Sequence, residues 1–272
     1  MSSVSQTRAD RRRRPRVALF VTCLADLFRP SVAFASLSLL KAAGCRVSVP
    51  EAQTCCGQPG YNSGDYDGAR AIAMRVIELF EDADYLVAPS GSCAGMITRH
   101  YPKLLDGEWK TRAQALANRT WEITAFLADV MPPTSFGNTD AGLRHRRIAY
   151  HDGCAGLREL DIREQPRALL REHAGVEVLE LEKRDVCCGF GGTFCAKMPE
   201  ISGSMASDKL RDCIDSGADM LVGGDLGCLL SLAGRASREG LDMEFRHVVE
   251  LLYAQRSESG IGQSATARPG SR

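Results

Sequence analysis

The sequence lacks several features that define common protein classes. Its 272 residues contain no run of about 18 apolar residues, the length that a membrane-spanning helix needs. Lys and Arg together number 34, as do Asp and Glu. The chain therefore lacks the basic excess expected of a protein that binds nucleic acid or an anionic membrane. It also has no Gly-x-Gly-x-x-Gly motif after a first strand and no glycine-rich loop followed by Lys-Ser/Thr, so no flavin, nicotinamide or nucleotide site is indicated.

The N-terminal segment lacks the apolar stretch of a secretory signal. The basic run Arg11–Arg14 precedes a short apolar run, Val17–Val21, which Thr22 and Cys23 end at once. A secretory or twin-arginine signal needs about 7–15 apolar residues. We therefore expect residues 1–15 to be a disordered basic tail before a cytoplasmic domain. Residues 256–272 are rich in Ser, Gly, Ala and Arg, and we expect them to be disordered too.

Cysteine, in contrast, is abundant, with 11 residues in the chain. In the reducing cytoplasm these thiols are not expected to pair as structural disulfides, so metal binding or redox chemistry is the better explanation.

The cysteines mark an internal duplication. The motif Cys55-Cys56-Gly57 recurs 132 residues later as Cys187-Cys188-Gly189. Cys23 and Cys93 have counterparts at offsets of 131 and 135 residues, namely Cys154 and Cys228. Neighbouring segments repeat at nearly the same offsets, including RVALF from residue 16 with RIAY from 147, and ADYLV from 83 with ADMLV from 218. A common offset for cysteine and non-cysteine segments indicates two copies of one unit.

Each copy alternates short apolar runs with amphipathic segments. Strands are expected at 17–22, 47–49 and 85–88, and again at 148–150, 176–179 and 220–222. Helices are expected at 31–43, 65–81 and 112–131, and again at 165–173, 200–216 and 244–255. This alternation predicts an α/β fold of two duplicated parallel-sheet halves related by a pseudo-two-fold axis. We expect repeats at 16–131 and 147–255, joined by a linker at 132–146.

The predicted strands bring the repeated cysteines to one edge of each sheet. Cys23 follows the first strand, Cys55 and Cys56 follow the second, and Cys93 follows the third. Loops at the carboxyl ends of parallel strands lie together, so four cysteines are expected to converge in each half. The second set is Cys154, Cys187, Cys188 and Cys228. Four soft sulfur ligands favour zinc or an iron–sulfur cluster, and a glycine after each Cys-Cys pair, Gly57 or Gly189, allows a sharp turn beside the metal.

Other residues near these cysteines are candidates for supporting roles. Cys195 lies seven residues after Cys188 and is a candidate extra ligand. His151 precedes Cys154 and either tunes a cluster and carries a proton, or is a structural residue at the end of a strand. Cys45 and Cys213 have no counterparts and are expected to be small apolar core residues. The glycine-rich loop 187–195 favours the second half as the better-equipped site, because Pro59 in the first-half loop has no amide to donate.

The double cysteine pattern resembles that of the cysteine-rich CCG domain family. The family pattern is a cysteine, then Cys-Cys-Gly, then Cys-x-x-Cys, usually present twice. Members include the cysteine-rich subunit of heterodisulfide reductase and the iron–sulfur subunit of glycolate oxidase. The resemblance spans about residues 16–255 and implies one or two iron–sulfur clusters, of the [4Fe-4S] type, held by the cysteines named above.

The chain departs from that pattern at one position in each half. Ser90 and Asp225 stand where the family has the first cysteine of Cys-x-x-Cys, so four cysteines remain per half where heterodisulfide reductase uses five. Four thiolates suffice for a [4Fe-4S] or [2Fe-2S] cluster, or for zinc. Ser90 and Asp225 are candidate oxygen ligands; the alternative for Ser90 is a helix cap.

The resemblance implies an iron–sulfur-binding redox subunit of a multi-subunit system that oxidises a 2-hydroxy acid, L-lactate. The chain would pass electrons between partner subunits of a lactate-utilisation complex, one of them an iron–sulfur protein, and would be inactive alone. One alternative is a zinc-bound structural or assembly protein of the same complex. Another is a metal-free dithiol oxidoreductase, which is disfavoured because adjacent cysteines form strained disulfides and the chain has no Cys-x-x-Cys.

Overall fold

A computed structural model describes residues 14–133, 143, 146–174, 176–253 and 259–263. The predicted tails at 1–15 and 256–272 and the predicted linker at 132–146 fall largely outside these residues. Within the described part of the chain, none of the helices has both the length and the apolar character needed to span a lipid bilayer.

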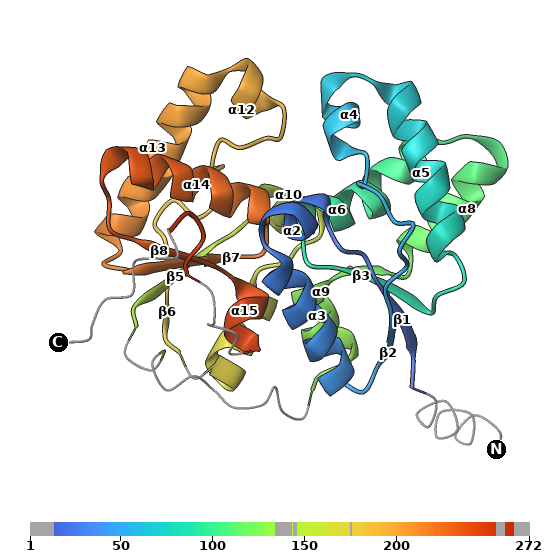
Figure 1. The fold of residues 1–272 in the computed structure, drawn as a ribbon, viewed down its shortest axis with the longest axis horizontal. Helices are drawn as coiled ribbons and strands as arrows, with labels where there is room; N and C mark the ends of the chain where they lie inside the picture. The colour runs from blue at the N-terminus through green and yellow to red at the C-terminus, as the bar shows by residue number, and fades with distance from the viewer. Residues whose placement is uncertain (1–13, 134–142, 144–145, 175, 254–258, 264–272) are drawn as a thin grey trace.

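Two four-stranded parallel sheets lie side by side (Figure 1). The first has the order β2-β1-β3-β4 and the second the order β6-β5-β7-β8. The strands of the first sheet are β1 (Arg16–Leu19), β2 (Arg46–Ser48), β3 (Tyr85–Ala88) and β4 (Thr120–Glu122). Those of the second are β5 (Ile148–His151), β6 (Val178–Leu179), β7 (Met220–Gly223) and β8 (Glu244–His247). The equivalent orders confirm the prediction of an α/β fold with two similar halves.

Helices connect the strands in both halves. The first half contains α2 (Cys23–Phe28), α3 (Pro30–Ala42), α4 (Gln58–Ser63), α5 (Tyr66–Phe80), α6 (Gly91–Gly95), the π-helical turn η1 (Met96–His100), α7 (Tyr101–Leu104), α8 (Gly107–Ala117), α9 (Ile123–Ala125) and the π-helical turn η2 (Phe126–Val130). The second contains α10 (Cys154–Glu159), α11 (Glu164–Leu169), the π-helical turn η4 (Leu170–Ala174), α12 (Phe194–Lys197), α13 (Pro199–Asp215), α14 (Leu226–Glu239) and α15 (Val248–Leu252). The helices predicted at 31–43, 65–81 and 200–216 agree with α3, α5 and α13.

The predicted closing helices at 112–131 and 244–255 are wrong, because each contains the fourth strand of its sheet. In the first half α8 ends at Ala117, and β4 precedes α9; in the second half β8 precedes α15. A side chain at the end of each strand starts the next helix. Glu122 Oε2 accepts hydrogen bonds from the backbone amides of Thr124 and Ala125, and His247 Nδ1 accepts one from Val249. Strands of three or four residues are too short for the alternating pattern that reveals a strand.

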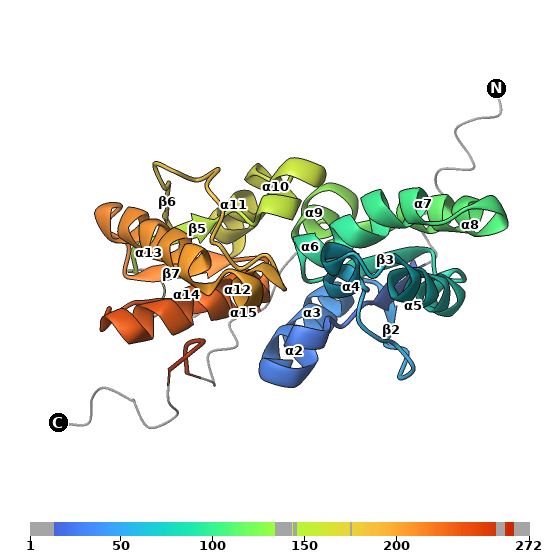
Figure 2. The ribbon, with the colours of Figure 1, turned by 90° about the horizontal axis from the view of Figure 1, so that it is seen from above.

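One hydrophobic cluster spans both halves, and a second lies within the first half. Buried side chains of α3, such as Leu39 and Leu40, belong to the same apolar cluster as Val248 and Leu252 of α15. The halves also meet where α6 contacts α10 (Figure 2). A Cβ atom built on Gly91 of α6 would lie 2.9 Å from the Cα atom of Gly156 of α10, so glycine lets these two helices touch. The carboxyl ends of the two sheets are thus held at a fixed separation.

A buried ion pair crosses between the halves. Arg29 Nε of the first half lies 2.7 Å from Glu250 Oε1 of α15, and Ser31 Oγ donates to the same oxygen at 2.8 Å. The other carboxylate oxygen of Glu250 accepts from the backbone amide of His247 at 3.0 Å. The Glu250 side chain is 0% exposed, so its charge is balanced only by groups of the protein.

Candidate metal centre

The first thiol group, Cys23, Cys55, Cys56 and Cys93, lies at the carboxyl edge of the first sheet. Cys23 is the first residue of α2 after β1, the Cys-Cys pair lies in the loop after β2, and Cys93 lies in α6 after β3. The Sγ atoms of Cys23 and Cys55 are 3.8 Å apart, and those of Cys56 and Cys93 are 3.5 Å apart. Sulfurs bound to one metal ion are about 3.5–4 Å apart, given metal–sulfur bonds near 2.3 Å.

The second thiol group, Cys154, Cys187, Cys188 and Cys228, occupies the equivalent edge of the second sheet. The Sγ atoms of Cys188 and Cys228 and a ring nitrogen of His151 all lie within 4.8 Å of one another. Two thiols of each group, here called the inner thiols, are buried: Cys56 and Cys93 in the first group, and Cys188 and Cys228 in the second. The other two, the outer thiols, are partly or fully exposed: Cys23 and Cys55, and Cys154 and Cys187. Each group is therefore anchored in the protein and open to solvent on one side.

Hydrogen bonds among the thiols run in the same order in both groups. Bonds from Cys23 and Cys56 lower the pKa of Cys55 to about 2, and bonds from Cys154 and Cys188 lower that of Cys187 to about 2. The bond to Cys55 in turn raises the pKa of Cys23. Each group thus contains one thiol whose thiolate form is strongly favoured, and a bound cation favours the thiolate form of its ligands.

A glycine turns the backbone directly after each Cys-Cys pair. Gly57 and Gly189 both have φ of +82°, a left-handed conformation that glycine adopts without the strain of a side chain. The backbone amide of Gly189 donates to Cys187 Sγ at 3.4 Å, which stabilises the thiolate form of that sulfur.

Alanine at Gly189 is expected to destabilise the protein more than alanine at Gly57. Both changes place a Cβ at positive φ, which costs about 1 kcal/mol. At Gly189 the new Cβ would also lie 2.6 Å from the carbonyl oxygen of Ser202, whereas at Gly57 the nearest atom is a side-chain methyl of Ile72 at 3.3 Å. Urea unfolding of the two variants measures the difference; equal losses would mean that the α13 backbone moves away freely.

Ser90 and Asp225 contact each other across the two halves. Ser90 Oγ donates to Asp225 Oδ1 at 2.6 Å, and the same oxygen accepts from the amide and hydroxyl of Ser92. Ser90 Oγ also accepts from the amide of Cys93 at 3.2 Å, which is the helix-cap role. The two positions that carry no cysteine therefore hydrogen-bond to each other between the thiol groups, and an oxygen-ligand role for either stays a prediction.

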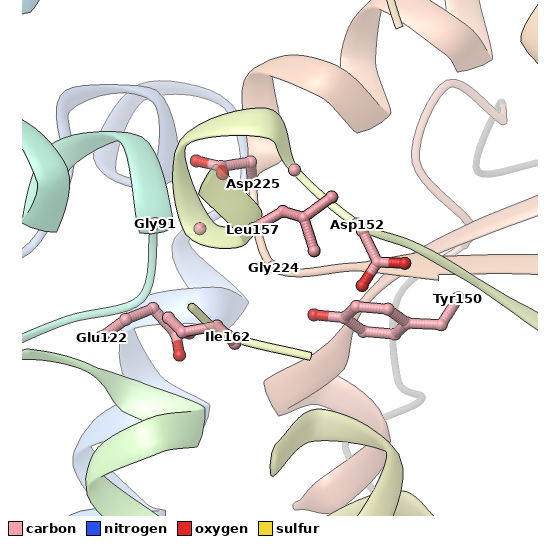
Figure 3. A pocket seen from close by; sticks show the side chains of 10 residues that line it. Gly91, Glu122, Tyr150, Asp152, Leu157, Ile162, Gly224 and Asp225 are labelled. Carbon is pink, nitrogen blue, oxygen red and sulfur yellow. The ribbon is translucent and has the colours of Figure 1, made fainter. Parts of the chain in front are cut away.

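A small cavity lies beside this contact. Its volume is about 20 Å³, and its lining includes Glu122 and Tyr150 from the two sheets, with Asp152, Asp225 and Gly91 (Figure 3). This is room for about one water molecule. Glu122 Oε1 is buried and has no hydrogen-bond partner in the described part of the chain. The cavity thus joins polar groups of both halves.

The free energy of unfolding is expected to fall less with rising pH in Glu122→Gln than in wild type. Burial is the largest cause that raises the pKa of Glu122 from 4.5 to about 7, and the nearby charge of Asp225 adds to the increase. Hydrogen bonds from Thr124 and Ala125 favour the anion and oppose this shift. A carboxyl group whose pKa is raised by folding destabilises the folded state as pH rises from the unfolded to the folded pKa, here by up to about 3 kcal/mol. Unfolding free energies at pH 5 and 8 measure this, and parallel pH profiles of wild type and Glu122→Gln would refute it.

Three cysteines, Cys45, Cys195 and Cys213, are not members of either thiol group. Cys195 Sγ donates to the carbonyl oxygen of Gly192 within its own loop, at 3.0 Å, so its role as an extra ligand stays a prediction. Cys45 and Cys213 are buried in the apolar core. Burial raises the pKa of Cys45 to about 11 and that of Cys213 to about 12, which leaves both as neutral thiols.

Two supports of the thiol groups were missed by sequence reasoning. Tyr101 Oη donates to the backbone carbonyl of Cys56 at 2.8 Å, and no local pattern marks this tyrosine. The guanidinium of Arg167 donates to both oxygens of Asp152, at 2.9 and 2.8 Å. Asp152 lies between His151 and Cys154, and its position next to a ligand candidate was the one available signal.

The fold and the two equivalent groups of four thiols define a duplicated cysteine-rich α/β protein. The sequence matches the model of the CCG family, described as "Cysteine-rich domain", over residues 17–98 and 148–233. The chain belongs to this family.

Curated relatives cover most of the chain. It is 42% identical over 248 residues to a protein of Oceanobacillus iheyensis named Lactate utilization protein A, covering 90% of this chain and 99% of that one. A protein of the same name from Macrococcus caseolyticus is 44% identical, covering 88% and 97%. Among solved structures, a hypothetical protein from Helicobacter pylori aligns with a TM-score of 0.59 at 10% identity, covering 90% of this chain and 50% of that one; this likeness concerns the fold alone.

Proposed function

We propose that the chain is an iron–sulfur-binding redox subunit of a multi-subunit system that oxidises L-lactate. The observation that carries the proposal is the presence of two groups of four thiols, each with hydrogen bonds between its members. The relatives named for lactate utilisation support the choice of substrate.

The donor set fits an iron–sulfur centre in each half. Four thiols per group match the four cysteine ligands of a [4Fe-4S] or [2Fe-2S] cluster. Cys23, Cys55, Cys56 and Cys93 would hold one centre, and Cys154, Cys187, Cys188 and Cys228 the other. Such a centre supplies one-electron transfer. The residues of this chain would fix the sulfurs, exclude water from the inner side and leave the outer side open to a partner.

Exposed apolar side chains on α2 and α3, the helices that follow Cys23, support a role for partner subunits. Leu27 and Phe28 at the end of α2 are 72% and 63% exposed, and Phe34 of α3 is 61% exposed. Large apolar side chains grouped on a surface are typical of sites of protein interaction. Since α2 begins at Cys23, a partner bound here would lie near the outer thiols.

The test is reduction of the anaerobically purified chain. An iron–sulfur protein is brown, loses visible absorbance on addition of dithionite, gives an EPR signal when reduced and recovers on oxidation. With lactate and an artificial acceptor, the chain alone should be inactive and should gain activity only with its partner subunits. Turnover of lactate by the isolated chain would refute the assignment as an electron-transfer subunit.

A zinc-bound structural protein is the second candidate. Four thiols per half, where heterodisulfide reductase uses five cysteines, also suit one tetrahedral zinc ion. The close approach of His151, Cys188 and Cys228 suits such an ion in the second half. Zinc protein would be colourless and unchanged by dithionite, so the same experiment separates the two candidates.

A further inference from the structure

The ring of His151 is buried at the second thiol group without a hydrogen-bond partner. His151 is the last residue of β5 and is 1% exposed. Neither Nδ1 nor Nε2 makes a well-aligned hydrogen bond in the described part of the chain, although the ring interacts with the Cys228 thiol. A buried polar atom without a partner costs about 1–3 kcal/mol, so two such atoms on one ring indicate a binding partner other than the polypeptide.

The neighbouring atoms identify the chemistry of that partner. A ring nitrogen of His151 and the Sγ atoms of Cys188 and Cys228 lie within 4.8 Å of one another. Metal–nitrogen bonds of about 2.0–2.1 Å and metal–sulfur bonds of about 2.3 Å place ligand atoms of one ion slightly closer than this. Small side-chain rotations therefore suffice to bring all three atoms to a metal.

The position of His151 follows from the pleat of β5. Successive side chains of a strand point to opposite faces. Tyr150 points into the small cavity between the halves (Figure 3), so His151 points to the other face, where Cys188 and Cys228 lie. Its neighbour in β7 is Gly223, which has no side chain beside the ring.

The first half has no imidazole at the equivalent position. At the offset of 131 residues that relates Cys23 to Cys154, the counterpart of His151 is Phe20. Phe20 is fully buried, and its ring packs on that of Phe80 with centroids 5.7 Å apart. The two halves therefore share the thiols and differ at this one neighbour, which is an apolar ring in the first half and an imidazole in the second.

We propose that His151 is a direct metal ligand of the second thiol group, so that the two centres of the chain differ in chemistry. The first is bound by thiolates alone and the second by thiolates and one imidazole. This inference rests on the proposed function only in requiring that the second thiol group binds a metal. It assigns His151 to the metal itself, rather than to a neighbouring or structural position.

A difference in reduction potential follows if the metal is an iron–sulfur cluster. Replacement of a negative thiolate ligand by a neutral imidazole raises the potential of an iron–sulfur centre. If His151 takes the place of one of the four thiolates, the second centre is therefore expected to be reduced at a higher potential than the first.

Isotope labelling tests the ligand without any substitution of His151. The chain is reconstituted with iron and sulfide, with histidine carrying either ¹⁴N or ¹⁵N, and pulsed EPR is recorded on the reduced protein. A strong nitrogen coupling that changes with the histidine isotope is expected. The Cys56→Ala chain, which lacks one ligand of the first group, should retain it. A reduced second centre without a histidine coupling would overturn the inference.

Two substitutions locate the nitrogen. His151→Phe copies the first half and should remove the coupling, whereas His173→Phe changes another histidine of the same half and should leave it. Circular dichroism of both variants checks that they fold. Survival of the coupling in His151→Phe would assign it to a different residue and refute the proposal.

Cobalt separates this inference from the iron–sulfur proposal. Co²⁺ bound to the anaerobic, metal-free chain reports nitrogen and sulfur ligands through its visible spectrum. If no iron–sulfur cluster forms, the inference still predicts that His151→Phe changes the cobalt spectrum and weakens the affinity of the second cobalt-binding step at least tenfold. That result would support the inference and refute only the cluster. Identical cobalt spectra and affinities in both chains, or no metal binding at all, would refute it.

Discussion

Alanine at Cys56 is expected to remove the metal of the first thiol group and leave that of the second, so that bound iron per chain falls by about half. Cys56 is buried, and its sulfur lies 3.5 Å from that of Cys93 at the inner side of the group. Alanine at Cys188 should remove the metal of the second group in the same way. Because Cys188 lies beside both Cys228 and His151, Cys188→Ala is expected to reduce pathway activity more than Cys56→Ala.

The double variant Cys56→Ala/Cys188→Ala should bind no iron after anaerobic reconstitution. The matched controls are Cys45→Ala and Cys213→Ala, which remove buried thiols that stay neutral and lie in the apolar core. Both controls should keep full iron. Equal iron in Cys56→Ala and wild type, or loss of iron in the controls, would contradict the assignment of the two groups.

Glutamine at Glu250 is expected to lower the free energy of unfolding by about 3–5 kcal/mol, the usual effect of removing one charge from a buried pair. Glutamine has nearly the shape of glutamate, so the effect comes from the lost charge beside Arg29. Because the pair joins α15 to the first half, both halves should unfold together at a lower temperature.

The control is Asp67→Asn, which breaks an exposed pair of similar length. Arg70 and Asp67 are 2.6 Å apart, but the Asp67 side chain is 96% exposed. Exposed pairs contribute about 1 kcal/mol or less. Thermal unfolding should therefore show a much smaller change than for Glu250→Gln; similar changes in both variants would mean that the pair between the halves does not stabilise the fold.

The sequence predicted those features that depend on local pattern and on the duplication. The common offset pairs Cys23 with Cys154 and Cys93 with Cys228. The convergence of the thiols followed because each cysteine comes directly after a parallel strand. Because glycine follows each Cys-Cys pair, sharp turns were predicted at Gly57 and Gly189, and both residues have positive φ.

The sequence did not predict features that depend on how the halves pack. Strands β4 and β8 are too short to show an alternating pattern, and the helices expected over them were wrong. The contact between Ser90 and Asp225 depends on the close approach of α6 to α10, which no local pattern encodes. His151 was identified as a neighbour of a cluster, but its distance to Cys188 and Cys228 comes from the pairing of β5 with β7.

Each thiol group is proposed to hold an iron–sulfur centre. The most direct test is a crystal structure of anaerobically purified protein with anomalous diffraction measured at the iron and zinc absorption edges. We predict one iron peak within bonding distance of Cys23, Cys55, Cys56 and Cys93, and a second beside Cys154, Cys187, Cys188 and Cys228. Zinc peaks at these positions, or iron at neither group, would contradict the account.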